Sequence, residues 1–168
     1  MGSFLYSKSM AHIHELYDFT VSAFILHPTK PQILLLKHLK LGKWLQPGGH
    51  VELHENPLQA LTHELEEEAG LSANDYTIIE LAEGPKTYGN NTSFPLPFYF
   101  NEHTFNETHK HIDICYLARA KTDEITTNPD GASAIKWLSL KEIEQHYTNG
   151  DVFDDTLQIC KWVFAKFF

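Results

Sequence analysis

The sequence predicts one domain that combines helices with a mixed β-sheet, of the α+β or the layered α/β/α kind. Short runs rich in β-branched and apolar residues recur along the chain, as strands require. Segments with apolar residues at three- and four-residue steps lie between and after them, as in helices that pack on a sheet. The length of 168 residues suits a single domain, and a hydrophobic content of 42% is enough for a packed core.

The first half of the chain is expected to supply two strands and one helix. Thr20–Leu26 and Gln32–Lys37 are short, apolar runs typical of strands. The chain then bends at Pro47–Gly49, where two glycines permit a close approach of the backbone. Asn56 is a favoured N-cap, and it precedes a proline that is tolerated in the first helical turn. A helix is therefore predicted over Pro57–Gly70, with the glycine as its C-terminal cap.

The second half is expected to complete the sheet and to add two helices. Tyr76–Leu81 has strand character, and Gly84–Pro97 has the Gly, Pro and Asn content of a loop. Further strands are predicted at Phe98–Phe100, His111–Ala120 and Ile135–Leu138, and helices at Ser139–Tyr147 and Asp155–Phe167.

The composition of the chain argues against some classes of partner and cellular location. A formal charge of −9 argues against a nucleic-acid polymer as partner, because phosphate backbones attract clustered Lys and Arg. No apolar run approaches the roughly 20 residues of a membrane span, so we expect a cytoplasmic protein without a membrane partner. Cys115 and Cys160 lack metal-finger spacing, which predicts reduced thiols. We expect one domain over residues 1–168, with residues 1–17 as an N-terminal extension and residues 151–168 carrying the C-terminal helix.

The helix at Pro57–Gly70 carries an unusual concentration of negative charge. Glu64, Glu67 and Glu68 share one helical face, whereas Glu66 points elsewhere. Each like-charged pair costs roughly 0.2–0.5 kcal/mol, and anions in the last turn oppose the helix dipole by roughly 0.3–1 kcal/mol each. No lysine or arginine lies near this helix in the sequence. Oxygen ligands that converge from one face are typical of a site for Mg²⁺ or Mn²⁺.

The spacing around these glutamates resembles a known family motif. Gly49 is followed after five residues by Glu55, after seven more by His63, and then directly by Glu64–Leu71. This resembles the Nudix box, G-x5-E-x7-R-E-U-x-E-E-x-G-U, in which U is a bulky aliphatic residue. Every specified position matches except His63, which stands where the family has arginine. The resemblance covers roughly residues 18–145.

The resemblance implies both a fold and a reaction. The fold is an α/β/α sandwich with a mixed sheet, and the reaction is hydrolysis of a nucleoside diphosphate derivative by water attack at phosphorus, with Mg²⁺ or Mn²⁺ as cofactor. It makes Glu67, Glu68 and the Gly49 carbonyl metal ligands, and Glu64 either a ligand or the general base. Glu55 would support the metal through water or a hydrogen bond, or would be a plain acidic residue near the helix N-terminus.

His63 is the departure from the motif and leaves three readings open. It can orient Glu64 less firmly than arginine does, which gives a slower enzyme, or it can act as a cation because neighbouring carboxylates raise its pKa. The third reading is a module that binds nucleotides without hydrolysis. We favour the first two. The isomerase branch of the superfamily is set aside because no cysteine precedes the metal helix.

A second group of candidates lies at the start of the strand predicted at His111–Ala120 and just before it. His109, His111 and Asp113 alternate along it and therefore share one face. Two imidazoles and a carboxylate on one face suit a metal or a substrate, but such a face is more often simply polar and exposed to water. We carry all three as substrate-binding candidates.

Other charged residues and two loops are expected to determine the substrate, a small nucleotide-type molecule whose identity stays open. Arg119, the one arginine of the chain, is a candidate for a terminal phosphate or an ordinary surface residue. Glu102 or Glu107, expected in a loop, can supply an assisting carboxylate. The loops Gly84–Pro97 and His103–Lys110 are expected to contact the group attached to the phosphates. A homodimer is left open.

Overall fold

The computed structural model describes residues 16–84, 89–128 and 131–168. Most of the expected N-terminal extension and four residues of the loop Gly84–Pro97 lie outside these ranges. The strands are β1 (Tyr17–Leu26), β2 (Ile33–His38), β3 (Trp44–Leu45), β4 (Gly48–His50), β5 (Tyr76–Ile78), β6 (Tyr99–Asn106), β7 (His109–Ala120) and β8 (Ala132–Leu138). The helices are α1 (Pro57–Ala69), α2 (Leu140–Thr148) and α3 (Asp154–Phe167).

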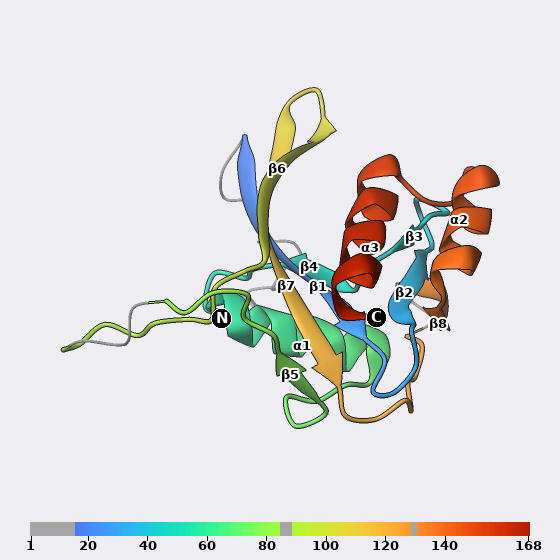
Figure 1. Cartoon of the computed structure of the whole chain (residues 1–168). Coiled ribbons are helices and arrows are strands. Elements are labelled where there is room, and N and C mark those ends of the chain that lie inside the picture. Colours follow the sequence, from blue (N-terminus) through green and yellow to red (C-terminus); the bar gives the residue numbers. More distant parts are fainter. Residues whose placement is uncertain (1–15, 85–88, 129–130) are drawn as a thin grey trace, which may run out of the picture.

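The eight strands form one mixed sheet around β1. The central path runs in the order β3-β2-β1-β7-β5, while β4 pairs with β1, β6 with β7 and β8 with β2. β1 and β7 run parallel along their length, and the other pairs are antiparallel. This confirms the mixed sheet. Figure 1 shows the β6–β7 hairpin rising from the body of the sheet.

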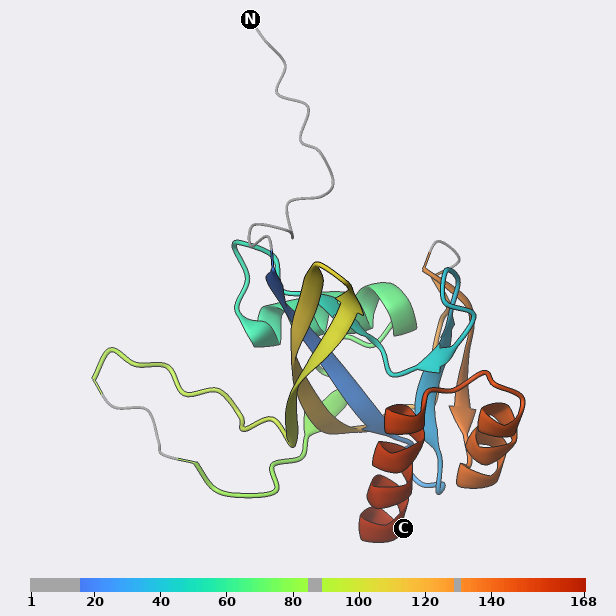
Figure 2. The ribbon, with the colours of Figure 1, turned by 90° about the horizontal axis from the view of Figure 1, so that it is seen from above.

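The sheet is covered on both faces, which confirms the α/β/α sandwich. Side chains alternate along β1, so that Val21, Ala23 and Ile25 belong to the apolar cluster that contains the core residues of α1. Phe24 and Leu26 belong to the other cluster, which contains the buried residues of α2 and α3. In the view from above, the sheet lies between α1 and α3 (Figure 2). The continuous burial of β1 follows from its coverage on both sides.

α1 begins and ends where its local sequence predicts. The Asn56 side chain accepts hydrogen bonds from the backbone N–H groups of Leu58 (3.0 Å) and Gln59 (3.1 Å). The Gln59 side chain in turn accepts from the Asn56 N–H at 3.0 Å, which completes a capping box. Gly70 ends the helix in the left-handed conformation, with φ of 68°. The residues that cap the two ends of α1 therefore fix its length and its place in the sequence, and with them the residues that share the glutamate face.

The segment before β7 differs from the expectation. A strand was predicted only at Phe98–Phe100, with a loop following, whereas β6 continues to Asn106 and forms a hairpin with β7. Glu102 is therefore a strand residue, and its Oε1 forms an ion pair with Nζ of Lys110 at 2.6 Å. Glu107 lies in the turn that connects the two strands. Nearly every residue of β6 is exposed, so the apolar alternation that identifies a strand is missing from its sequence.

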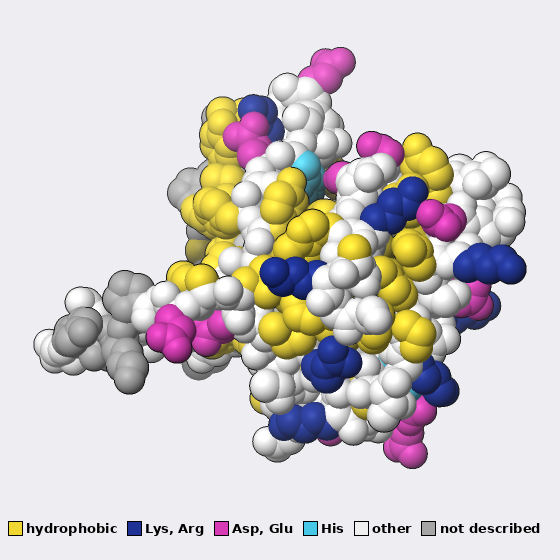
Figure 3. All heavy atoms as spheres, viewed as in Figure 1, with side chains coloured by type: hydrophobic (Ala, Val, Ile, Leu, Met, Phe, Trp, Pro, Cys, Tyr) yellow, Lys and Arg dark blue, Asp and Glu magenta, His cyan; other side chains and the backbone are white. Residues whose placement is uncertain are grey.

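The remaining expectations concern the cysteines and the surface. Cys115 and Cys160 are both free and buried. Within the described residues, no helix is long and apolar enough to cross a membrane. On the face that carries α3, apolar side chains gather between β6 and α3 (Figure 3).

Candidate functional site

α1 presents its glutamates unequally to the sheet. Leu61 and Leu65 are fully buried, and their burial stabilises the helix by roughly 1.5–3 kcal/mol each. That gain exceeds the repulsion of about 0.2–0.5 kcal/mol for each pair of like charges. The same packing holds Glu64 and Glu68 half-buried and leaves Glu67 exposed. The hydrophobic core thus holds an acidic cluster that would be unfavourable in an isolated helix.

Two glycines of β4 lie directly against this acidic face. The Gly48 N–H donates a hydrogen bond of 2.9 Å to Oε2 of Glu68. A Cβ atom at Gly49 would overlap the carboxylate of Glu64, so only glycine leaves room for that carboxylate. β4 is held in place by β1, where Ser22 pairs with Gly48 and Val21 with Gly49. The bend or close approach predicted at the two glycines is thus a short strand that lies close to the helix and brings the Gly48 N–H to it.

Burial makes the carboxyl groups of Glu64 and Glu68 weaker acids than usual. It raises the pKa of Glu64 to about 7, an effect that His63 opposes and that the nearby carboxylate of Glu67 reinforces. Burial also raises the pKa of Glu68 to about 7, although the hydrogen bond from Gly48 opposes the shift. Both groups therefore hold protons part of the time at neutral pH when no cation is present. A bound cation would favour their ionised forms.

His63 lies between two flanking carboxylates. Its Nδ1 is 3.3 Å from Oε1 of Glu55, and its Nε2 is 3.3 Å from Oε2 of Glu67. Both carboxylates can accept a hydrogen bond only when both ring nitrogens carry a proton. The Asn128 side-chain amide donates to the other oxygen of Glu67 at 3.2 Å. His63 therefore joins Glu55 to Glu67, and the charge that it carries acts on Glu64 through space.

The donor set at this site fits a hard divalent cation. Glu64, Glu67 and Glu68 offer carboxylate oxygens, and Gly49 of β4, the expected carbonyl ligand, lies against the side chain of Glu64. Among the described residues, no lysine or arginine forms an ion pair with these three carboxylates. Oxygen-only donors with excess negative charge are the preference of Mg²⁺ and Mn²⁺.

A hollow of about 540 Å³ lies beside the amino-terminal part of α1. Its walls come from that helix and from the segment Thr92–Phe94 of the loop that follows β5. His63 and Glu66 both line it, so it begins next to the glutamate cluster. One of the two loops expected to contact substrate therefore faces the helix that carries the acidic residues.

The predicted group of His109, His111 and Asp113 lies on one strand face, but that face is largely buried and not exposed to water. His109, His111 and Asp113 share one face of β7, as predicted, yet His111 is 8% and Asp113 only 5% exposed. Asp113 accepts hydrogen bonds from the hydroxyl groups of Thr20 (3.0 Å) and Ser22 (2.7 Å). Burial raises its pKa, and these bonds oppose the shift. Both carboxylate oxygens of Asp113 thus already have hydrogen-bond donors on the neighbouring strand β1.

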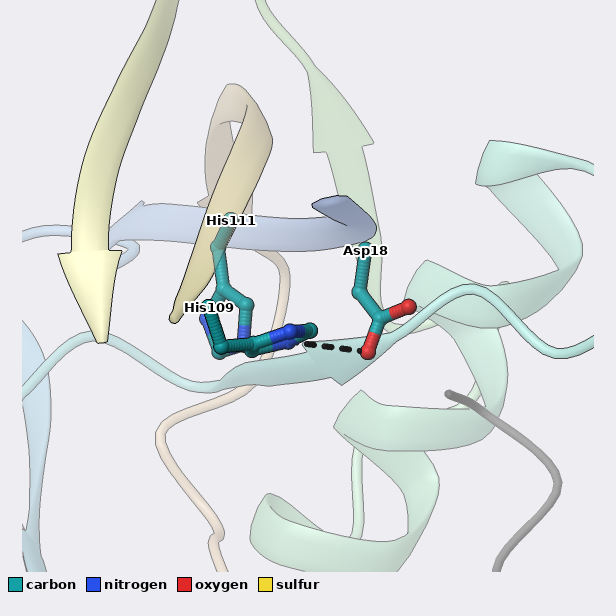
Figure 4. A group of neighbouring side chains, drawn as sticks. All are labelled: Asp18, His109 and His111. Atoms are coloured by element: carbon teal, nitrogen blue, oxygen red, sulfur yellow. Dashed lines mark ion pairs between the residues drawn. The ribbon is translucent and has the colours of Figure 1, made fainter. Parts of the chain in front are cut away.

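The carboxylate that joins the two histidines is Asp18, which the sequence analysis missed. Its Oδ2 is 3.1 Å from Nε2 of His109, and ligand atoms of Asp18, His109 and His111 all lie within 4.8 Å of one another (Figure 4). In the parallel pairing of β1 with β7, Asp18 lies opposite His111. The strand predicted from Thr20 left Asp18 outside. Extending the strand by two residues would have placed it on the same face.

Arg119 lies apart from the other substrate-binding candidates. It is ten residues beyond His109 along β7, near the opposite end of the strand. Its Nη1 donates to the carbonyl of His27 at 3.2 Å, and its guanidinium lies 5.8 Å from the ring centre of Phe168. These contacts anchor the end of the strand.

Comparisons with known proteins agree with this geometry. The profile of the NUDIX domain family matches residues 16–157. Among solved structures, a NUDIX-family hydrolase from Clostridium perfringens superimposes with a TM-score of 0.70 at 24% identity, covering 88% of this chain and 96% of that one. At this identity the likeness concerns the fold.

Curated relatives match parts of the chain. A probable DHNTP pyrophosphohydrolase from Lactococcus lactis subsp. cremoris is 31% identical over 113 residues, which is 64% of this chain and 58% of that protein. An RNA pyrophosphohydrolase from Ruthia magnifica subsp. Calyptogena magnifica is 46% identical over 57 residues, or 34% of this chain and 31% of that protein. The chain thus spans less than two thirds of the length of either relative.

Proposed function

Because the chain belongs to the Nudix family, we propose that it is a pyrophosphohydrolase that cleaves a phosphoanhydride bond in a nucleoside diphosphate derivative. The observation that carries this proposal is the junction of α1 with β4. There Glu68 accepts the Gly48 N–H and the Glu64 carboxylate occupies the space that a side chain at Gly49 would fill. The junction brings carboxylates together where one cation can meet them, and in our proposal the Gly49 carbonyl completes the set.

In this proposal the acidic face of α1 holds Mg²⁺ or Mn²⁺. Glu67, Glu68 and the Gly49 carbonyl would be ligands, with Glu64 as a further ligand or as the base and Glu55 in support. The bound cation would supply a positive charge to phosphate oxygens and make a coordinated water more acidic. The 3.3 Å contact of His63 with Glu55 ties this outer residue to Glu67 and keeps the cluster together.

Burial raises the pKa of both Glu64 and Glu68 to about 7, and we assign the general base to Glu64 because Glu68 already accepts the Gly48 N–H. A base works best when its pKa is close to the pH of the reaction, and burial brings the pKa of Glu64 to about 7. The carboxylate would take one proton from the attacking water. The water oxygen forms the new bond to phosphorus, the bridging P–O bond breaks, and the leaving phosphate group keeps the electron pair.

A panel of phosphoanhydrides tests this function. Purified protein with Mg²⁺ or Mn²⁺ should release phosphate or pyrophosphate from at least one member, and chelation should abolish the release. The panel holds sugar nucleotides, dinucleoside polyphosphates, nucleoside triphosphates and a 5′-triphosphorylated oligonucleotide, because one relative is named an RNA pyrophosphohydrolase. Tight nucleotide binding without turnover, even at high protein concentration, would instead favour the non-hydrolytic module.

Replacing His63 with arginine tests how the flanking carboxylates are held. Arginine keeps its charge throughout the useful pH range and can bridge two carboxylates, whereas the charge of a histidine depends on pH. We expect His63→Arg to flatten the pH profile of kcat/KM. The ratio of its kcat/KM to that of the wild type should therefore increase as the pH is raised from 6 to 8.5. His63→Gln, which cannot carry a charge, is the control and should be slower than both. An identical profile for all three proteins would remove His63 from the mechanism.

The proposed partner is a small nucleotide-type molecule. The hollow beside α1 is open to the segment Thr92–Phe94, where the group attached to the phosphates would lie next to His63. Free, buried cysteines suit the reducing interior of a cell, where we place the enzyme.

A further inference from the structure

A cluster of histidines lies on the sheet face opposite α1. His109 and His111 of β7 follow the side of the strand that continues into Cys115 and Leu117, which pack with the α3 core. Titratable side chains from three other strands lie beside them, so the cluster depends on the folded sheet. Those neighbours are Asp18 of β1, His50 of β4 and His103 of β6.

The contacts within this cluster are close. Oδ2 of Asp18 is 3.1 Å from Nε2 of His109 and 3.9 Å from Nε2 of His50. The ring of His111 lies 5.0 Å from that of His50, 5.1 Å from that of His103 and 5.1 Å from that of His109, measured between ring centres. Figure 4 shows the side chains of His109 and His111 from β7 lying beside that of Asp18 from β1.

The centre of the cluster is buried, whereas His103 at its edge is exposed. Asp18 is 2% exposed and His111 is 8% exposed. Within the part of the chain that the structure describes, the buried Nε2 of His111 has no hydrogen-bond partner. Burial, followed by the charges of the neighbouring histidines, lowers the pKa of His111 to about 4.

A buried polar atom without a partner costs free energy that a bound ligand would recover. Asp113, the next acidic residue along β7, already accepts hydrogen bonds from Thr20 and Ser22 and does not need one. Asp18 lies beside two imidazoles, and the ligand atoms of the three residues are all within 4.8 Å of one another. The geometry thus selects one carboxylate and two imidazoles.

We infer that Asp18, His109 and His111 form a second metal site, which takes a divalent transition-metal cation such as Zn²⁺, with His50 or His103 as a further ligand. Imidazole nitrogen suits Zn²⁺, Co²⁺ and Ni²⁺, whereas Mg²⁺ is bound through oxygen. Bonds of roughly 2.0–2.2 Å to one ion would require these ligand atoms, which now lie within 4.8 Å of one another, to draw closer together.

This site is distinct from the glutamate cluster and does not depend on the proposed function. The two sites share only β4, in which Gly49 pairs with Val21 while the adjacent His50 pairs with Thr20. Because successive residues of a strand point to opposite faces, Gly49 belongs to the α1 side and His50 to the histidine side. The two sites also differ in donor atoms, so each can be filled without the other.

Titration of the full-length protein with Co²⁺, in the presence of excess Mg²⁺, tests the inference. We expect one equivalent of Co²⁺ to bind with visible absorption bands of a nitrogen-containing ligand set, and Zn²⁺ to displace it. His109→Gln and Asp18→Asn should each weaken Co²⁺ binding by at least about tenfold. Two controls should bind as the wild type does: His54→Gln, at an exposed loop position, and Glu68→Gln, in the other site.

Two results would overturn the inference. One is the absence of stoichiometric Co²⁺ binding to the wild-type protein, which would make the cluster a purely hydrogen-bonded one. The other is binding that survives His109→Gln and Asp18→Asn but is lost in Glu68→Gln. Circular dichroism of each metal-free variant verifies its fold, and His109→Gln decides alone if Asp18→Asn does not fold, because His109 lies at the end of its strand.

Discussion

Replacing Glu68 with glutamine should lower kcat by at least roughly 100-fold and leave the fold intact. Glutamine has the shape of glutamate, and its side-chain oxygen can still accept the 2.9 Å hydrogen bond from the Gly48 N–H. What is lost is the negative charge. In the proposed mechanism this charge helps to hold the cation that stabilises the phosphate transition state.

Glu144→Gln is the matched control, since it makes the same chemical change on α2, at the opposite face of the sheet from α1. Glu144 is exposed, and a substitution at such a position changes free energies by less than about 0.5 kcal/mol, or roughly twofold in rate. Both variants are compared by kcat, KM and the Mg²⁺ concentration that gives half-maximal rate. If the kcat of Glu68→Gln stays within tenfold of that of Glu144→Gln, Glu68 does not hold the catalytic cation.

Sequence analysis succeeded where the signals are local. The start of α1 is encoded by Asn56 and Gln59, three residues apart, and its end by Gly70, so its boundaries and its glutamate face could be predicted from neighbours in the sequence. α2 begins at the predicted cap, Ser139, whose capping box is completed by Glu142. Such signals act over three or four residues and need no knowledge of tertiary structure.

The features that sequence analysis missed depend on contacts between distant strands. β6 has no apolar alternation, and it is ordered by pairing with β7, so nothing in its own sequence identified it. The shared face of His109 and His111 follows from alternation within one strand, but the burial of that face does not. Asp18 joins them only because β1 and β7 run parallel, a pairing between residues about ninety positions apart.

The contact of His63 with Glu67 was within reach of sequence analysis, because the two residues are four positions apart on a helix. The contact with Glu55 was not, since it depends on how the chain enters the helix. Arginine at this position was expected to orient Glu64, yet the observed partners of His63 are the two outer carboxylates. The charge of His63 therefore reaches Glu64 only through space.

Gly48→Ala should destabilise the protein by at least about 3 kcal/mol, which lowers Tm by roughly 6–12 °C. Gly48 has φ of 151°, which residues with side chains rarely adopt. Its new Cβ would also overlap the carbonyl oxygen of Val21 and lie 2.6 Å from Cα of Ser22. Both are backbone atoms of the central strand, so the clash cannot be relieved by rotating a side chain. Thermal unfolding measures the effect.

Two further glycine substitutions separate the causes of this loss. Gly42→Ala also has positive φ, of 64°, but meets nothing within 4 Å, so it should cost only about 1–2 kcal/mol of backbone strain. In Gly49→Ala the three atoms nearest to the new Cβ all belong to the flexible end of Glu64, which can turn away. Its Tm should stay within about 4 °C of the wild type, while the displaced Glu64 costs at least tenfold in kcat. Equal Tm losses for Gly48→Ala and Gly42→Ala would contradict the argument, because the contact of β4 with β1 would then add nothing to the strain.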